Sequence, residues 1–177
     1  RQLDRSGTAW STLMTQSTTV QLAIPKGRMY EGILQLFNDA GVQLKTSSRG
    51  YRPTLNLEGF NAKLLKPQNI VEMLDSGSRD VGFAGKDWVL EKGAELIELL
   101  DTQLDPVQVV AAAPRDLLVE GRLPTMKLRV ASEYVNIARD WVKRQALDAQ
   151  VIRSYGATEV FPPEDAEVII DNTATGA

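Results

Sequence analysis

The chain has 177 residues and contains no cysteine and no histidine. These absences exclude a disulfide framework, a thiolate nucleophile, a Ser-His-Asp triad and the commonest zinc ligands. Any chemistry must therefore depend on Lys, Arg, carboxylates, hydroxyls and backbone N–H groups. The net charge of −3, from 20 basic and 23 acidic residues, weighs against a surface that coats nucleic acid. No apolar run approaches the ~20 residues of a membrane span.

Basic residues are concentrated at the start of the chain. The first 66 residues hold 9 of the 20 basic residues and only 4 of the 23 acidic ones. This local excess favours a small anionic ligand, and the alternative is chance clustering of surface charge. Residues 1–19 are polar, rich in Ser and Thr and without periodicity, so we expect a mobile leader there and no secretory signal.

From Val20 onward, short apolar runs alternate with amphipathic segments. Apolar runs that end at Gly, Pro or polar turns predict strands, whereas apolar residues three or four apart predict helices. The sequence predicts strands at 20–24, 62–66 and 80–84, a strand or sheet edge at 95–100, and loops with short strands over 42–60. It predicts helices over 29–40 before Gly41, from Pro67 to Gly77, and over 86–92 before Gly93.

The run PVQVVAAAP at 106–114 is almost entirely apolar and predicts a long buried strand that crosses between two lobes. Beyond it the sequence predicts strands at 127–131, 150–154 and 167–171, a helix over 132–147 and a short helical turn within 156–165. Strands that alternate with helices are typical of an α/β fold with mostly parallel sheets. The break near residue 105 divides the chain into a lobe at 20–105 and a lobe at 106–177.

The last segment, EVIIDNTATGA at 167–177, has the pattern of a phosphate-binding loop. An apolar strand runs into Asp171, which Thr173, Thr175 and Gly176 follow. Small residues let an anion approach successive backbone N–H groups, as in a phosphate nest. The Asp171 carboxylate suits ribose hydroxyls, or Mg²⁺ held through water. The alternative is an ordinary strand-to-turn transition.

Two basic segments near the start are candidates for binding a polyphosphate. In IPKGRMY at 24–30, Lys26 and Arg28 flank Gly27 beyond a strand, where open α/β sheets bind ligands. Two cations in that position suit phosphate oxygens, and a solvated basic turn is the alternative. Arg49, in the loop TSSRGYR, either reaches a ligand or belongs to a plain surface loop.

Two further strand ends carry candidate residues. In FAGKDW at 83–88, Gly85 permits close approach to the backbone, while Lys86 and Asp87 either face a ligand or simply begin a helix. In SYGATE at 154–159, Glu159 follows a strand end of the second lobe. If this strand end faces a ligand, Glu159 could reach a ribose or a metal.

In this order, four segments resemble the ATP phosphoribosyltransferase family, which catalyses the first step of histidine biosynthesis. The segments, which span about residues 20–177, are AIPKGRMYEGILQLFNDAGV, LLKPQNIVEMLDSGSRDVGFAGKDWVLEKG, RVASEYVNIARDWV and EVIIDNTATGA. The resemblance implies two lobes like those of type II periplasmic binding proteins, with mostly parallel sheets and the active site in the cleft between them. It implies Mg²⁺-dependent transfer of the phosphoribosyl group from PRPP to N1 of ATP, with release of pyrophosphate.

The resemblance also implies roles for individual residues. The family's phosphate loop, which binds the ribose 5-phosphate, maps onto Asp171, Ala174, Thr175, Gly176 and Ala177. The family's cations for pyrophosphate and ATP map onto Lys26, Arg28 and Arg49. Asp171 and Glu159 are placed toward the ribose hydroxyls and Mg²⁺, and the segment from Gly85 to Asp87 lines the cleft. The family likeness further implies a cytoplasmic homo-oligomer, with or without a separate regulatory subunit.

Two departures from the family pattern leave alternatives open. The family loop continues with Thr-Leu and returns to the first lobe, whereas the sequence stops at Ala177, so we expect a catalytic core cut inside its phosphate loop. The segment 42–60, which contains Arg49, is irregular beside the family pattern. The alternatives are an inactive truncated core and a non-catalytic small-molecule-binding module of the same fold. Porphobilinogen deaminase is set aside because it attaches its cofactor through cysteine.

Overall fold

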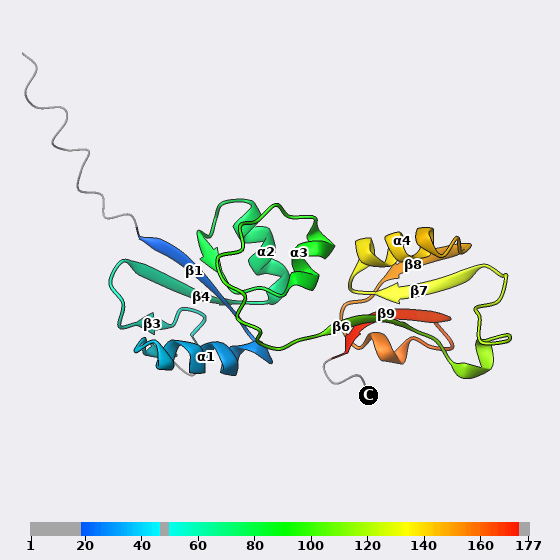
Figure 1. The fold of residues 1–177 in the computed structure, drawn as a ribbon, viewed down its shortest axis with the longest axis horizontal. Helices are drawn as coiled ribbons and strands as arrows, with labels where there is room; N and C mark the ends of the chain where they lie inside the picture. Colours follow the sequence, from blue (N-terminus) through cyan, green and yellow to red (C-terminus); the bar gives the residue numbers. More distant parts are fainter. Residues whose placement is uncertain (1–18, 47–49, 174–177) are drawn as a thin grey trace, which may run out of the picture.

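The computed structural model describes residues 19–46 and 50–173, so the leader expected at 1–19 lies, apart from Thr19, outside the described residues. Within this part, the strands form a sheet in the order β4-β1-β5, a hairpin of β2 and β3, and a sheet in the order β6-β9-β7-β8. We call the two larger sheets the first sheet and the second sheet. Figure 1 shows them at opposite ends of an elongated molecule, each with its own helices.

The elements follow one another largely as the alternating sequence pattern predicts. In chain order they are β1 (Val20–Pro25), α1 (Met29–Asp39), β2 (Leu44–Lys45), β3 (Thr54–Leu55), β4 (Phe60–Leu65), α2 (Pro67–Asp75), β5 (Val81–Gly82), α3 (Lys86–Lys92), β6 (Gln108–Ala112), η1 (Arg115–Leu117), β7 (Leu128–Ser132), α4 (Val135–Arg144), β8 (Ala149–Arg153), η2 (Thr158–Val160) and β9 (Val168–Thr173). The prediction of an α/β fold with mostly parallel sheets is confirmed.

The first sheet is built around β1, which has parallel neighbours on both sides. Successive residues of a strand face opposite sides of the sheet. Ile24 accordingly packs in a cluster with Ile33 of α1, while Ala23 packs in another with Ile70 of α2. Because helices cover both faces, β1 is buried from Leu22 to Pro25, which is why a largely apolar run predicted it.

The second sheet has parallel strands β7, β8 and β9, and β6 runs antiparallel to β9 at its edge. Its core is a cluster in which Val130 of β7 and Ile170 of β9 pack with Ala138 of α4. α4 covers one face of the sheet, and η2 lies on the opposite face against β9 (Figure 1). The two sheets therefore have separate hydrophobic cores.

Helix ends confirm the sequence signals more closely than strand lengths do. α2 begins at Pro67, and α3 ends before Gly93, whose φ of 60° gives the left-handed conformation that glycine adopts at low cost. Gly41, beyond α1, likewise has a φ of 74°. The helix expected over 132–147 begins only at Val135, because Ser132 is still paired in β7.

Three strand predictions need correction. Residues 95–100, which the structure describes in full, form irregular coil with Ile97 88% exposed, because no strand in the described ranges lies beside β5 there to pair with them. The strand expected at 80–84 is reduced to the short β5. The run 106–114 gives β6 at the edge of the second sheet, where Ala111 and Ala112 are exposed, so it is not a buried strand.

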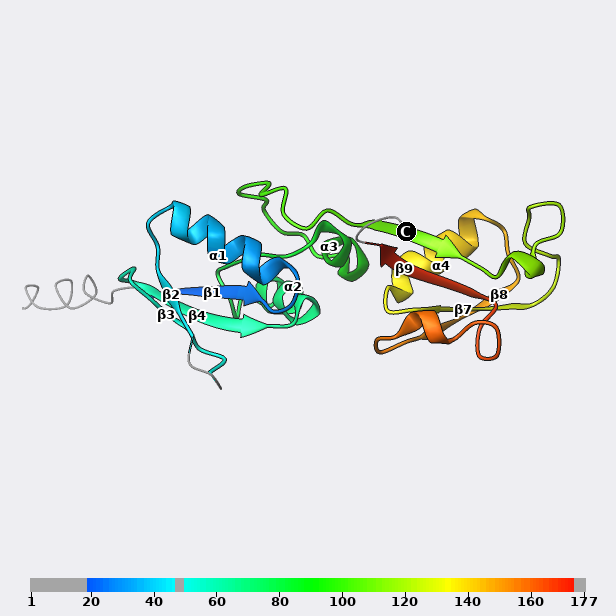
Figure 2. The same cartoon turned by 90° about the horizontal axis from the view of Figure 1, so that it is seen from below.

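The carboxyl ends of the parallel strands in the two sheets point toward each other (Figure 2). α3 follows the first sheet and contacts the beginning of α4, which follows β7 in the second sheet. Val71 of α2, Trp88 of α3 and Tyr134 form a buried cluster at this junction. None of the helices in the described ranges combines the length and hydrophobicity needed to cross a membrane.

Candidate active site

A cleft with a volume of about 1540 Å³ opens where the carboxyl ends of the strands converge. Its walls include the turn after β1, the segment 80–90, the coil 95–107, Glu133 after β7 and Asn172 of β9. Ligands of open α/β sheets bind beyond the carboxyl ends of the strands, so this is the position that the fold favours for a binding site.

The turn after β1 brings two predicted cations to the cleft, Lys26 and Arg28. Gly27 between them has a φ of 91°, a left-handed conformation that a residue with a Cβ rarely adopts. The Lys26 ammonium lies 3.3 Å from the centroid of the Tyr51 ring, and Arg28 Nε lies 3.4 Å from Asp105 Oδ2. Arg28 is half-exposed, so its ion pair with Asp105 is one that a polyanionic ligand can displace.

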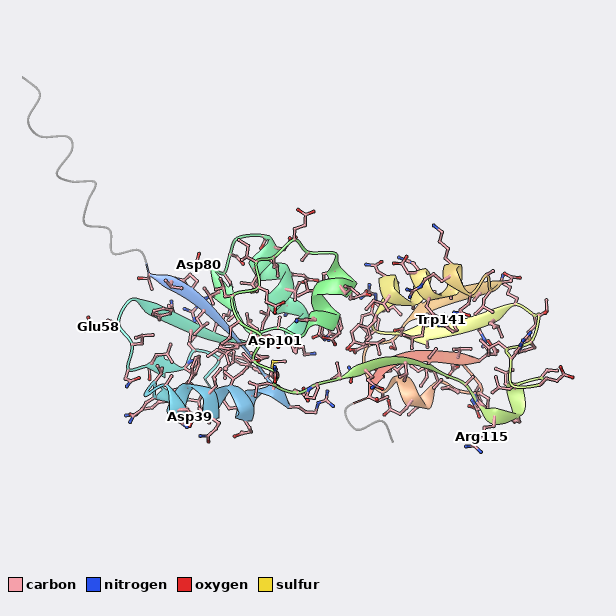
Figure 3. All side chains as sticks on the ribbon, in the orientation of Figure 1. Asp39, Glu58, Asp80, Asp101, Arg115 and Trp141 are labelled. Atoms are coloured by element: carbon pink, nitrogen blue, oxygen red, sulfur yellow. The ribbon has the colours of Figure 1, made fainter. Side chains whose placement is uncertain are left out.

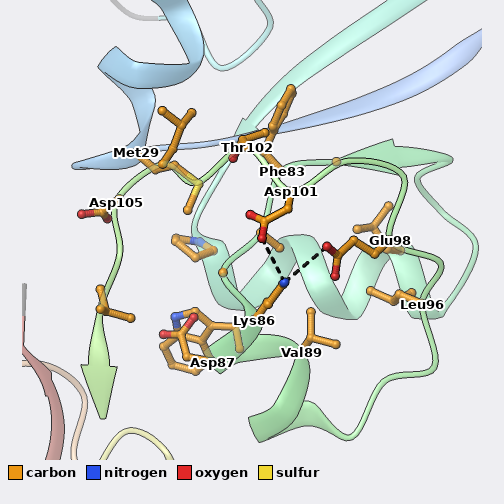
Figure 4. Close-up of a pocket in the computed structure, with 18 of the residues that line it drawn as sticks. Met29, Phe83, Lys86, Asp87, Val89, Leu96, Glu98, Asp101, Thr102 and Asp105 are labelled. Carbon is orange, nitrogen blue, oxygen red and sulfur yellow. Dashed lines mark hydrogen bonds and ion pairs between the residues drawn. The ribbon is translucent and has the colours of Figure 1, made fainter. Parts of the chain in front are cut away.

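Lys86, at the start of α3, lines the cleft but is paired with acidic residues of the cleft wall. Its Nζ lies 3.3 Å from Glu98 Oε1 and 3.3 Å from Asp101 Oδ2 (Figure 4). Hydrogen bonds to Glu98 and then to Asp101 raise the pKa of Lys86 above its ordinary value. The backbone N–H of Gln103 and then Lys86 lower the pKa of the Asp101 carboxyl. Lys86 therefore brings no uncompensated positive charge to the cleft.

Asp87 lines the same cleft and is fixed from the opposite side. The Tyr134 hydroxyl donates a 2.6 Å hydrogen bond to Asp87 Oδ2 and accepts one of 2.6 Å from Asn172 Nδ2. Burial and then the bond to Asp87 raise the pKa of Tyr134 far above its ordinary range, so the hydroxyl stays protonated. A Cβ at Gly85 would overlap Asp87 Oδ1, so a larger residue there would displace that carboxylate.

Glu91, on the same helix as Asp87, joins the two parts of the molecule. Glu91 is 3% exposed, and its carboxylate accepts hydrogen bonds from the backbone N–H groups of Asn136 (2.9 Å) and Ile137 (3.0 Å) in the first turn of α4. The Asn136 side-chain amide also donates to the Glu91 carbonyl, at 2.8 Å. Tyr134 occupies the Ncap position of α4, but its side chain makes no capping hydrogen bond in the described structure. The Glu91 carboxylate, from another helix, therefore accepts the N–H groups that a capping side chain would otherwise accept.

The predicted phosphate-loop side is described only in part. Asp171 and Thr173 belong to β9, and Asp171 Oδ1 accepts the Asn172 N–H at 2.7 Å. Because successive strand residues alternate, Asp171 and Thr173 lie on the face of β9 opposite Ile170 and Asn172. The other predicted residues of the loop and the predicted third cation lie outside the described residues; they are Ala174, Thr175, Gly176, Ala177 and Arg49.

Among the predicted site residues that the structure describes, the cleft gathers Lys26, Arg28 and the segment 85–87. Glu159, exposed in η2, and Asp171 and Thr173 in β9 are not among the residues that line it. Sequence reasoning missed Asn172, Tyr134 and Glu91. No local signal marks them, because their partners lie between 38 and 47 residues away along the chain.

The fold and the cleft define an α/β protein with mostly parallel sheets and an open cleft at the carboxyl ends of its strands. Comparison with known proteins agrees: the family model HisG, described as ATP phosphoribosyltransferase, matches residues 66–177. The chain belongs to the ATP phosphoribosyltransferase family, which confirms the resemblance seen in the sequence.

Individual relatives carry the same name. The chain is 32% identical over 170 residues to the ATP phosphoribosyltransferase of Chlorobium phaeovibrioides, and 34% identical over 162 residues to that of Thermodesulfovibrio yellowstonii. These matches cover 93% and 89% of this chain but only 58% and 56% of the relatives, so the chain spans little more than half their length. A solved structure, the ATP phosphoribosyl transferase (HisG:HisZ) complex from Thermotoga maritima, has a TM-score of 0.75 at 26% identity and covers 89% of this chain and 75% of its own.

Proposed function

We propose that this chain forms the catalytic core of an enzyme that transfers the phosphoribosyl group of PRPP to N1 of ATP. The products are phosphoribosyl-ATP and pyrophosphate, in the first step of histidine biosynthesis. The observation that carries the proposal is the cleft at the converging strand ends, with Lys26 and Arg28 on its wall in a member of this family.

We further propose that residues 20–105 and 106–177 are the two lobes of a type II periplasmic-binding-protein-like fold. The separate cores of the first and second sheets support this division. In the proposal, the lobe at 20–105 binds ATP and pyrophosphate, and the lobe at 106–177 binds the 5-phosphate of PRPP.

The assignment of residues follows from charge. Lys26 and Arg28, with Arg49, would neutralise the pyrophosphate that leaves as the ribose C1 gains positive charge. Arg28 is suited to this because its guanidinium donates in a fork that matches phosphate oxygens, and its present partner Asp105 is easily exchanged. The nucleophile is a ring nitrogen with a lone pair, so alignment of two bound substrates replaces a strong general base.

The phosphate of PRPP would bind the loop that follows β9. Thr173 ends β9 and is the last described residue before this loop, to which the proposal assigns Ala174, Thr175, Gly176 and Ala177. Gly85, Lys86 and Asp87 would line the opposite side of the cleft. Asp171 would accept hydrogen bonds from ribose hydroxyls on the η2 face of β9.

Mg²⁺ is the metal that the family resemblance implies, and among the described residues two carboxylates, those of Asp171 and Glu159, are candidates to hold it. Asp171 lies in β9 and Glu159 in η2, two elements that pack against each other. Across the described ranges no three acidic side chains gather to hold a metal on their own. Two protein carboxylates suit Mg²⁺, because this ion takes many of its ligands from water and substrate phosphates. Bound there with PRPP, Mg²⁺ would supply charge neutralisation, while Asp171 and Glu159 would anchor it.

We include the partners and location in the proposal. The substrates are ATP and PRPP, and the chain assembles with further copies of itself in the cytoplasm. The Thermotoga maritima structure is titled as a HisG:HisZ complex, which supports a separate second subunit for this chain too.

Incubation of the chain with ATP, PRPP and Mg²⁺ tests the proposal. Release of pyrophosphate together with a new adenine-derived chromophore is the expected result. Arg28→Ala should lower kcat/KM by on the order of 10²-fold, the usual loss for one stabilising donor. Arg115→Ala is the matched control, because Arg115 is exposed on the far side of the second sheet from Asp101 (Figure 3).

The outcomes separate the alternatives. Binding of both substrates without pyrophosphate release would indicate a non-catalytic binding module. Activity that appears only in a chain extended beyond Ala177 would indicate an incomplete core. An active chain whose rate is unchanged by Arg28→Ala would remove Arg28 from the site.

A further inference from the structure

A buried hydroxyl connects the two sides of the cleft. Asn172 of β9 donates to Tyr134 Oη, and the Tyr134 O–H donates to Asp87 of α3, both at 2.6 Å. Asp87 and Asn172 line the cleft, whereas Tyr134 is fully buried and does not line it. Any influence of Tyr134 on a ligand must therefore pass through Asp87 and Asn172.

Tyr134 is held rigidly at both of its ends. Its ring packs on Trp88 with the ring centroids 4.6 Å apart. Its backbone N–H donates to Ser132 Oγ at 2.9 Å, and the Ser132 hydroxyl donates to the Ile170 carbonyl of β9 at 2.5 Å. Ring and backbone together fix where the hydroxyl lies, so little conformational entropy remains to be lost when it orders its partners.

The hydrogen bonds of this group have a defined direction. A phenol has one proton to donate, and the Asp87 carboxylate oxygen accepts it. The oxygen of Tyr134 then accepts from the Asn172 amide, which sets the orientation of that amide. The amide oxygen of Asn172 and the second carboxylate oxygen of Asp87 are left as acceptors, which suit hydroxyl or amino groups of a ligand.

We propose that Tyr134 is a positioning residue that holds Asp87 and Asn172 in fixed relation across the cleft. This inference rests on the proposed function in one respect, namely that the ligands are ATP and PRPP. Asn172 lies between Asp171 and Thr173 of the proposed phosphate loop, and Asp87 follows Lys86 on the opposite wall. The Tyr134 hydroxyl thus couples the alignment of the two substrate sites.

The coupling can be tested without substrate. In Tyr134→Phe, which keeps the ring and removes the hydroxyl, the NMR amide resonances of both Asp87 and Asn172 should shift, including the Asn172 side-chain amide. Tyr155→Phe is the control, because Tyr155 is 88% exposed, and it should move neither. Resonances that move on one side of the cleft only, or on neither, would overturn the proposed connection.

Kinetics test the positioning role. Tyr134→Phe should lower kcat about tenfold while leaving the KM of both substrates within about twofold, because the ligand contacts remain but their alignment is lost. In an Asp87→Ala background the same substitution should cost less than about threefold, since residues that act through one another are not additive. A full tenfold loss there would overturn the role. Absence of pyrophosphate release from both this chain and a chain extended beyond Ala177 would instead refute the proposed function, while the NMR comparison would still decide the connection.

Discussion

Removal of the Glu91 carboxylate should destabilise the molecule more than any exposed acidic substitution. Glu91→Ala leaves the N–H groups of Asn136 and Ile137 without their acceptor at the start of α4. Hydrogen bonds to a charged group contribute about 1.5–3 kcal/mol each, and loss of a helix cap costs about 0.5–2 kcal/mol. Asn136 is exposed, so water replaces part of the loss. The free energy of unfolding should therefore fall by about 2–3 kcal/mol, which lowers Tm by about 5–10 °C in a chain of this size.

Urea unfolding followed by far-UV circular dichroism, together with calorimetry, measures this difference. Glu95→Ala is the control, because Glu95 is exposed on the coil that follows the same helix, and it should change stability by no more than about 0.5 kcal/mol. Glu91→Gln keeps one acceptor oxygen and should fall between the two. If Glu91→Ala unfolded like Glu95→Ala, the cap supplied across the two sheets would not stabilise the fold.

Two further substitutions test other parts of the structure. Arg129 lowers the pKa of Glu167 and donates to it at 2.6 Å, so Glu167→Gln should lower Tm at pH 7 more than the exposed control Glu164→Gln does. Because the pKa of Glu167 is lower in the folded protein than in the unfolded chain, the stabilisation by Arg129 is complete above the ordinary pKa of a glutamate and is lost as the pH falls through the lowered value. A difference in Tm between Glu167→Gln and Glu164→Gln that widened in acid would contradict the assignment. Gly85→Ala should displace Asp87, since the added Cβ overlaps its Oδ1, and should reduce kcat while Tm falls only slightly; an unchanged kcat in an active chain would show that the position of Asp87 is unimportant.

The Pro and Gly residues at helix ends predicted the helices well, because they act on the backbone within a few residues. Pro67 fixes the start of α2 through its backbone angle, and Gly93 ends α3 by taking up a left-handed conformation. Strand formation also depends on what lies beside the segment. The apolar run at 95–100 has strand composition, yet in the described structure it has no neighbouring strand and remains coil.

The part of the candidate site that depends on local sequence could be predicted, whereas the contacts between distant segments could not. The turn that carries Lys26 and Arg28 follows a buried strand, so its place at the cleft could be inferred from the order of elements alone. The pairing of Lys86 with Asp101 could not, because it depends on how the coil after α3 returns over the helix. Nothing near Tyr134 in the sequence indicates that its hydroxyl reaches Asp87. The roles of Asp171 and Glu159 stay predictions.

The cap on α4 has a consequence for the order of folding. Glu91 precedes Asn136 by 45 residues, so during synthesis the acceptor leaves the ribosome before the helix that needs it. An isolated helix of ten residues is marginal in water, and α4 has only that length. The first sheet and α3 can already be folded when α4 emerges, and they then offer a preformed template for its first turn. We therefore expect α4 to form slowly in the second half of the chain alone, and faster when the first sheet and α3 have already folded.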